Sequence, residues 1–333
     1  SFEKEIVPLL AKRCLECHNA RDVKGGLDLS SRKATLQGGD SGHVIAAGKA
    51  ADSPLIERLA AGEMPPKSRG QSQKLPADEI AMLTRWIAEG AQWPAGREID
   101  IYEKTTDVRG GLDWWSLQPV RRPAVPLIRQ TERVTNPIDA FILAQLEKRN
   151  LKPAPPADKQ TLIRRAYFDL LGLPPSPGVV EEFSRDPSDQ AFRALIDRLL
   201  ASPHFGERMA VHWLDLVRYA DTCGIHSDNP ISMSPFRDYV IRSFNSNKPF
   251  DRFTLEQLAG DLLPGAKDDV WLKVASGYNR LNMMTTEGGA QDKEYLAKYA
   301  ADRVRTTSTT WLGATLGCAE CHDHKFDPYT SRD

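Results

Sequence analysis

The sequence predicts a mainly α-helical fold with two parts, a small helical domain at residues 1–96 and a larger helical domain at residues 136–333. Apolar residues recur at helical spacing near both ends of the first part. Residues typical of helix starts and helix ends alternate along the second part. Residues 97–135 carry turn residues and several prolines but no helical periodicity. We therefore expect an extended linker there, with room for one short strand.

Two amphipathic helices define the small domain. The first is expected at residues 3–13 and brings Cys14 to its end, and the second is expected at residues 76–91, with Gly90 near its end. Their apolar faces consist of Ile6, Leu9 and Leu10 in the first helix and Ile80, Leu83, Trp86 and Ile87 in the second. The stretch between them is rich in Gly, Ser and polar turns, so a domain this small needs something besides its own core to stabilise it.

The larger domain contains one helical pattern after another. Asn136 followed by Pro137 is a helix start, because asparagine caps the first turn and proline fits its first position. We expect the helices at 136–150, 158–175, 188–203 and 234–244, one capped by Thr254, and a last long one from about 292 to 316.

Four of the five cysteines form two copies of one pattern, "CLECH" at residues 14–18 and "CAECH" at residues 318–322. Each copy offers two thiols one helical turn apart, followed at once by an imidazole. A c-type haem needs this set for two thioether bonds and a proximal iron ligand. The predicted haem-binding residues are Cys14, Cys17 and His18 in the first copy and Cys318, Cys321 and His322 in the second. The sequence therefore predicts two covalently bound haem c groups, with His18 and His322 on the iron.

The four cysteines of these motifs have two alternative uses. The two CxxC pairs could make one four-thiolate zinc site, but about 300 residues separate them, and zinc would not explain the histidine that ends each copy. A redox disulfide is expected within a βαβ pattern, which neither copy has around it. The fifth cysteine, Cys223, is interpreted as a small buried residue.

Met64 is the predicted sixth ligand of the first haem. It lies in "GEMPP", where two prolines stiffen the chain and prevent a helix, so the thioether is held on an extended loop. Ligation by histidine and methionine favours a relatively high reduction potential.

The sixth ligand of the second haem stays open. His324 is too close in sequence to His322 to reach the other side of the same iron. It could instead bind a propionate, fix the turn or bind another metal. The remaining candidates are His204, His212, His226, Met283 and Met284, each of which could equally be structural.

Polar residues concentrate at residues 212–230, "HWLDLVRYADTCGIHSDNP". We expect His212, Asp215 and Tyr219 on one helical face with Arg218 beside them, before an irregular loop. In that loop His226 and Asp228 are the catalytic candidates, because an imidazole beside a carboxylate suits proton transfer. "TTEGG" at residues 285–289 is a second polar segment of this kind.

Longer motifs carry a family resemblance. "CLECH" with "GEMPPK" resembles the planctomycete cytochrome c domain, of the small class I-like type. "DWWSLQPVRRPAVP", "HWLDLVRYADT", "PFRDYVIRSFN", "PFDRFTLEQLAGDLLP" and "CAECHDHKFDP" resemble the large domain that follows it in the same family. The resemblance implies exported proteins, periplasmic or beyond, that are often associated with the breakdown of complex carbohydrates. It also implies a further C-terminal domain, so we expect this sequence to be truncated at Asp333.

Three function classes follow. The first is a haem-dependent oxidoreductase that oxidises a carbohydrate-type substrate near the second haem and passes electrons through the first haem to a partner protein. The second is a non-catalytic di-haem electron carrier, and the third a di-haem peroxidase. A net charge of −1 gives no sign of nucleic-acid binding, and no apolar run is long enough to cross a membrane. Since haem is attached outside the bacterial cytoplasm, we expect export, and a chain that opens at Ser1 has the look of a processed form.

Overall fold

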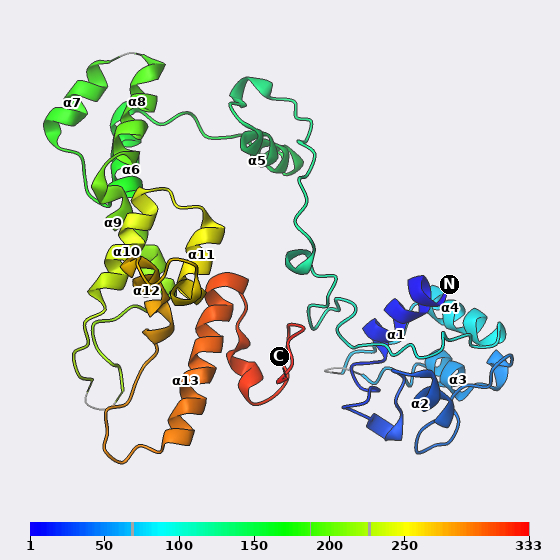
Figure 1. Cartoon of the computed structure of the whole chain (residues 1–333). Coiled ribbons are helices and arrows are strands. Elements are labelled where there is room, and N and C mark those ends of the chain that lie inside the picture. The colour runs from blue at the N-terminus through cyan, green and yellow to red at the C-terminus, as the bar shows by residue number, and fades with distance from the viewer. Residues whose placement is uncertain (68–69, 187, 226–227, 333) are drawn as a thin grey trace. The chain divides into compact units, whose positions relative to one another are not determined.

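The computed structural model describes all residues except 68–69, 187, 226–227 and 333. It divides into two compact units. The first comprises Ser1–Arg122 together with Cys321–Asp333, and the second comprises Pro123–Glu320. In the described part of the chain the regular elements are helices, and β-type pairing is confined to isolated bridges such as Ser31 with Glu98 (Figure 1). The predicted mainly α-helical class is confirmed.

The first unit is built around α1 (Val7–Arg13) and α4 (Ala77–Ala88). A π-helical turn at Phe2–Ile6 leads directly into α1. The shorter helices α2 (Arg32–Gln37) and α3 (Pro54–Ala61) were not foreseen in the Gly-rich stretch between α1 and α4. The apolar faces predicted for the two main helices form the core, which includes Leu10, Leu83 and Ile87. The apolar spacing therefore located both helices correctly.

The second unit contains nine helices within the described residues. They are α5 (Pro137–Lys148), α6 (Lys159–Leu171), α7 (Pro177–Arg185), α8 (Asp189–Leu200), α9 (Pro203–Leu216), α10 (Ser234–Asn245), α11 (Phe250–Ala259), α12 (Val270–Ala275) and α13 (Asp292–Thr307). The predicted start of α5 is confirmed, because the Asn136 side chain accepts hydrogen bonds from the backbone N–H groups of Ile138 and Asp139. Asp158 caps α6 in the same way through Thr161.

Three boundaries predicted in this unit were wrong. α11 begins at Phe250, four residues before Thr254, so Thr254 lies inside the helix, where its hydroxyl accepts a hydrogen bond from Trp311 Nε1 at 3.0 Å. The last long helix ends at Thr307, and a π-helical turn (Ser308–Leu312) then stops at Gly313, whose φ is +60°. α9 ends at Leu216, because Arg218 adopts a φ of +54°.

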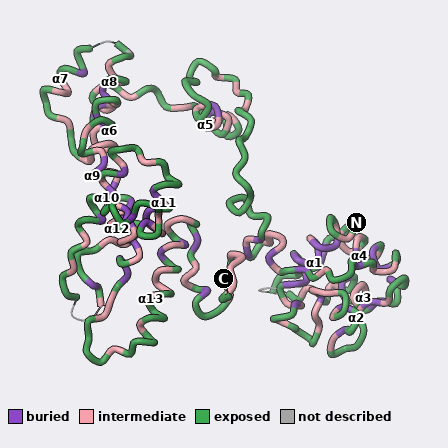
Figure 2. The backbone as a smooth tube through the Cα atoms, viewed as in Figure 1, coloured by how far each residue is buried: buried purple, intermediate pink, exposed green. Residues whose placement is uncertain are grey.

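Buried residues, coloured purple along the backbone in Figure 2, include two apolar clusters in the second unit. One lies among α6, α7 and α8 and contains Ile163, Phe183 and Leu195. The other lies among α9, α10, α11 and α12 and contains Phe236 and Phe253, with many aromatic contacts. Since each helix turns one apolar stripe inwards, these clusters account for the order of the helices in space.

A buried carboxylate holds the second cluster together. Glu256 on α11 is 5% exposed and accepts hydrogen bonds from Arg252 Nε at 2.7 Å, from the Tyr239 hydroxyl at 2.9 Å and from Lys248. Burial alone would raise the pKa of Glu256, but the bonds from Lys248, Arg252 and Tyr239 outweigh it and hold the pKa below its usual value. The carboxylate is therefore ionised and fully engaged at neutral pH.

Replacing Glu256 with Gln should lower the free energy of unfolding of the second unit by about 1–3 kcal/mol at neutral pH, since it removes a buried charge from two cations. The depressed pKa stabilises the fold above the usual glutamate pKa of about 4.3, and this stabilisation is lost as the pH falls through the lower folded value. The difference between wild type and variant should therefore shrink in acid. Hydrogen exchange of α10 and α11 peptides across pH measures it.

Glu181→Gln is the matched control, because Glu181 pairs with Arg185 at 3.1 Å on an exposed face of α7. Its effect should stay within about 0.5 kcal/mol at any pH. If the two substitutions lowered the free energy of unfolding equally, burial would add nothing to the stabilisation that Glu256 provides.

Candidate haem site

The first CxxCH motif is a tight turn at the end of α1. Cys14 occupies the C-terminal cap of the helix, and its carbonyl oxygen accepts hydrogen bonds from the backbone N–H groups of Cys17 at 3.2 Å and His18 at 3.0 Å. The His18 carbonyl accepts from Leu29 N–H at 2.9 Å, which ties the end of the turn to the following loop. Two thiols and one imidazole are thus presented together by backbone bonds alone.

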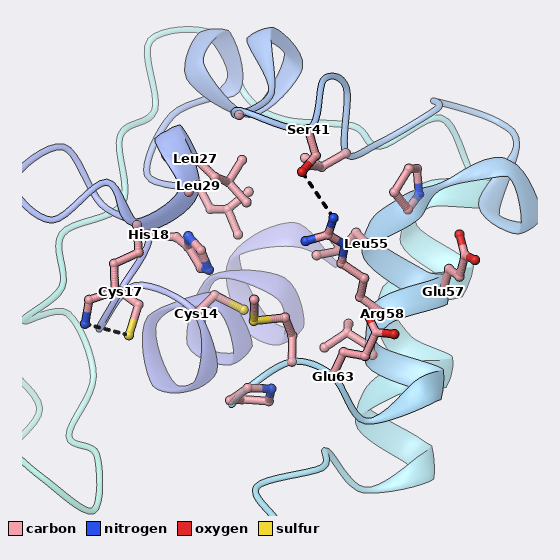
Figure 3. A pocket seen from close by; sticks show the side chains of 18 of the residues that line it. Cys14, Cys17, His18, Leu27, Leu29, Ser41, Leu55, Glu57, Arg58 and Glu63 are labelled. Carbon is pink, nitrogen blue, oxygen red and sulfur yellow. Dashed lines mark hydrogen bonds between the residues drawn. The ribbon is translucent and has the colours of Figure 1, made fainter. Parts of the chain in front are cut away.

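This turn forms one wall of a pocket of about 570 Å³ (Figure 3). Cys14, Cys17 and His18 line it from the side of α1, and Met64 lines it from the loop after α3. Apolar side chains, among them Leu27, Leu29, Leu55 and Leu59, make up much of the remaining wall. The volume lies in the range of sites for small organic molecules and cofactors.

The chemistry of the lining suits a haem. His18 Nδ1 is buried and finds no hydrogen-bond partner among the described residues, so its imidazole is not used to stabilise the protein itself. Burial raises the pKa of the Cys14 thiol to about 12, which marks an apolar setting around the sulfur. Both cysteines are free of disulfides. Thiols, imidazole, thioether and apolar wall in one pocket fit a covalently bound porphyrin.

Cations at the pocket were not foreseen from the sequence. Arg58 on α3 lines it and donates from Nη2 to the Ser41 hydroxyl at 3.2 Å (Figure 3). Lys24 also lines it, with Nζ 3.6 Å from Cys17 Sγ and 3.4 Å from the Asp22 carboxylate. Such groups could hold the propionates of a haem. No spacing in the sequence indicates them, because they meet only after the loops fold.

His43 is a second residue that sequence reasoning missed. It lines the same pocket as Met64, and its Nδ1 donates to the Leu36 carbonyl at 2.9 Å. This bond would fix the tautomer and leave the other ring nitrogen as a potential ligand. His43 is therefore the alternative to Met64 for the sixth position.

The second CxxCH motif has a different setting. Leu316–Glu320 forms a 3₁₀ turn that carries Cys318, and Cys321 and His322 follow it. All three of these side chains are exposed. His322 Nδ1 donates to the Asp323 carbonyl at 2.7 Å, which leaves the other ring nitrogen available as a ligand.

His324 is buried and holds the turn after the second motif. Its Nδ1 accepts hydrogen bonds from the backbone N–H groups of Phe326 at 3.3 Å and Asp327 at 2.9 Å. The Asp327 carboxylate lies 3.3 Å from the same nitrogen. Of the three roles predicted for His324, these contacts favour the fixing of the turn.

The other described ligand candidates lie in the second unit, two on α9 and two in the segment before α13. His204 is exposed on α9 and pairs with Glu207 at 2.9 Å, while His212 is exposed on the same helix. Met283 is 49% exposed, and Met284 lies next to it. In the described ranges, no group of three or more His, Cys, Asp and Glu side chains could hold a metal ion.

The helical face predicted to carry His212, Asp215 and Tyr219 was wrong in part, because α9 ends before Tyr219. The Tyr219 hydroxyl instead donates to Asp221 at 2.8 Å. Arg218 turns away to Asp302 of α13, with Nη2 at 2.5 Å.

The structure does bring the two polar segments of the sequence together. Met284 N–H donates to the Cys223 carbonyl at 2.8 Å, and Asn229 Nδ2 donates to the Thr286 hydroxyl at 2.8 Å. Asp228 accepts from Gly224 N–H at 2.7 Å, so this carboxylate also shapes its own loop. His226 lies outside the described residues.

A second hollow, of about 550 Å³, lies beside these segments. It is lined by residues 285–288 and by Tyr295 and Tyr299 of α13. The Tyr299 hydroxyl accepts from Thr285 N–H at 2.8 Å. Separately, none of the helices in the described ranges combines the length and apolar character needed to cross a lipid bilayer.

Comparisons with known proteins identify both parts of the chain. The family model described as "Protein of unknown function (DUF1549)" matches residues 137–333, and the one described as "Planctomycete cytochrome C" matches residues 14–68. Neither the curated proteins nor the solved structures gave a match. The planctomycete cytochrome C model spans both the CLECH turn and Met64, and a domain of this kind implies haem c. The DUF1549 model covers more than half of the sequence, so the chain belongs to the DUF1549 family, and a planctomycete cytochrome C domain precedes its DUF1549 region.

Proposed function

We propose that this chain is an exported di-haem c-type cytochrome that serves as a haem-dependent oxidoreductase. In this proposal a carbohydrate-type substrate is oxidised at or near the second haem, and a partner protein exchanges electrons with the first. The observation that carries the cytochrome function is the pocket that gathers Cys14, Cys17, His18 and Met64. A haem bound there supplies one-electron chemistry.

The first site is the better defined of the two. Cys14 and Cys17 would hold the porphyrin by thioether bonds, and His18 would be the proximal ligand. Met64 is proposed as the sixth ligand, because it enters the same pocket from a separate loop. The leucines of the wall would give the haem a partly apolar setting, which favours the less charged ferrous state together with the soft sulfur ligand.

A second haem at Cys318, Cys321 and His322 is supported by the repeated motif and by the exposure of all three side chains. Exposed thiols are accessible to the attachment chemistry. The His322 bond to the Asp323 carbonyl would orient the imidazole with one nitrogen ready to bind iron.

The substrate site is proposed at the hollow lined by Thr285 to Gly288, to which Asn229 is tied by its hydrogen bond to the Thr286 hydroxyl. Two tyrosines, threonine hydroxyls and carboxylates surround it, and sugars bind to aromatic faces and to such polar groups. His226 with Asp228 remains the proposed pair for taking the hydroxyl proton of an alcohol group while its electrons pass to the ferric haem, because imidazole side chains ordinarily titrate near neutral pH.

The electron carrier is the second candidate function. The Asp228 contact with Gly224 N–H favours it, since a carboxylate already used to shape its own loop has less freedom to orient a base. In that case the polar segments of the second unit would be structural.

Mass spectrometry of the denatured protein, matured in a host that attaches haem c, should show two haem additions. Replacing Cys318 and Cys321 with Ala should remove one of them and leave the first site intact. Cys223→Ala is the control, because Cys223 is buried outside both motifs, and it should keep both additions. A wild-type mass with a single addition would refute the second haem, and stoichiometric zinc would favour a thiolate metal site.

Met64→Ala should abolish the weak sulfur-to-iron absorption of the first haem and lower its reduction potential, because the soft sixth ligand is lost. Visible spectra and a redox titration of the purified protein measure both effects. Met82→Ala is the matched control, since Met82 packs against the same core but does not line the pocket. If Met64→Ala leaves the spectrum unchanged and His43→Ala alters it, the ligand is His43.

Sugars, sugar acids and polyols should reduce the ferric protein if it is a dehydrogenase. His226→Ala should then slow turnover by about 10²-fold or more, because a general base contributes at least that much, while the ferric spectrum keeps its form. A change to high spin in the variant would instead show that His226 is an iron ligand. Failure of the whole panel to reduce the wild-type protein would support the carrier.

A further inference from the structure

The segment that follows the second motif packs on the first unit. This C-terminal segment, residues 323–332, belongs with Ser1–Arg122, together with the last two residues of the motif, although the DUF1549 match runs through it. Gly110 N–H donates to the Phe326 carbonyl at 2.6 Å, and the Tyr102 hydroxyl donates to the His324 carbonyl at 3.5 Å. Arg21 forms an ion pair with Asp323. The contacts therefore begin one residue after His322.

A buried arginine connects the same surface to the first motif. The Arg109 side chain is 5% exposed, and its Nη1 donates to Glu16, one of the two residues between Cys14 and Cys17, which does not line the pocket. Nε and Nη2 both donate to the Ile101 carbonyl, at 3.1 and 2.9 Å. The guanidinium carbon lies 5.6 Å from the centre of the Tyr102 ring.

These contacts form a continuous path between the two motifs. It runs from Glu16 through Arg109 to Tyr102, and from Tyr102 to the backbone of His324. The Arg21 to Asp323 ion pair forms a second, parallel link, three residues after His18 and one after His322. Burial of a guanidinium is tolerated only when its donors are satisfied, so this arrangement is specific rather than a loose surface contact.

We propose that Arg109, Tyr102 and Asp323 are positioning residues that dock the C-terminal segment on the cytochrome unit and hold the second CxxCH motif close to the first. The charge of Asp323, far away in sequence, then acts on the first haem site. The Asp323 side chain is 30% exposed and that of Arg21 is 52% exposed, so solvent screens this charge in part, and its effect on the first site should be largest at low ionic strength. The effect of Asp323 on the first site requires only the first haem to be bound. The part of this proposal that concerns two haems rests on the proposed function.

Hydrogen exchange of the full-length holoprotein tests the docking. Arg109→Gln should accelerate exchange at residues 323–331 by about tenfold or more, since the loss of one buried charged hydrogen-bond group weakens docking by that factor. Arg85→Gln is the control, because Arg85 forms an exposed ion pair with Glu5 in the same unit, and it should leave this segment unchanged. Asp323→Asn leaves the Arg109 contacts in place and should also accelerate exchange, which keeps the test valid if Arg109→Gln fails to fold.

A redox titration tests the electrostatic consequence. Asp323→Asn should raise the potential of the first haem, because removal of a nearby negative charge destabilises the ferric state. Glu89→Gln removes an exposed charge at the end of α4 and should cause no comparable shift. Unchanged exchange in both Arg109→Gln and Asp323→Asn would overturn the docking, and an unchanged first potential would overturn the coupling. A mass with one haem would refute the second haem of the proposed function while leaving both measurements decisive.

Discussion

The apolar core shared by α1, the turn before it and α4 is the constraint on which the first unit depends. Leu10 and Ile87 are almost completely buried in this core, the centre of the Phe2 ring lies 5.9 Å from that of Trp86, and the chain leaves α1 at Cys14. The CLECH turn therefore takes its position from the core, and residues after α2 and α3 supply further walls of the pocket. A turn set in this way can present two thiols and an imidazole to the same face of a planar group.

The second unit is stabilised by a core of a different kind. Its helices are short and many, and its central cluster buries polar as well as apolar side chains. Trp213 Nε1 donates to Gln257 Oε1 at 2.8 Å, beside the network around Glu256. Buried polar groups are stable only when they are paired, so these bonds require one particular register of α9, α10 and α11. The loop after α9 and the start of α13 take their places from that register, and with them the polar hollow proposed for substrate.

The two CxxCH motifs differ in what surrounds them. The first lies in a formed pocket that Met64 also lines, whereas the second is exposed and is followed by a segment tied to the first unit. A haem held within a lined pocket suits electron transfer, and an exposed site suits contact with a substrate or a partner. This difference is the structural reason to propose distinct roles for two motifs that look alike in sequence.

The sequence by itself determined the features that depend on local spacing. These features each depend on fewer than sixteen consecutive residues, because helix geometry and haem attachment both act over that range. They are the two CxxCH motifs, the apolar faces of α1 and α4 and the capped start of α5. Local signals failed where a helix start was stabilised by packing, as at α11, and where a left-handed residue such as Arg218 ended a helix that its composition would continue.

Only the tertiary structure decided which distant residues meet. Met64 and His43 line the first pocket from separate loops and Arg58 lines it from α3, and no pattern links them in the sequence. The same holds for Arg109 with Glu16 and for Arg21 with Asp323, which lie from about ninety to about three hundred residues apart. Such contacts follow from how whole elements pack, and packing depends on the volume and shape of many side chains at once, which a one-dimensional pattern does not record.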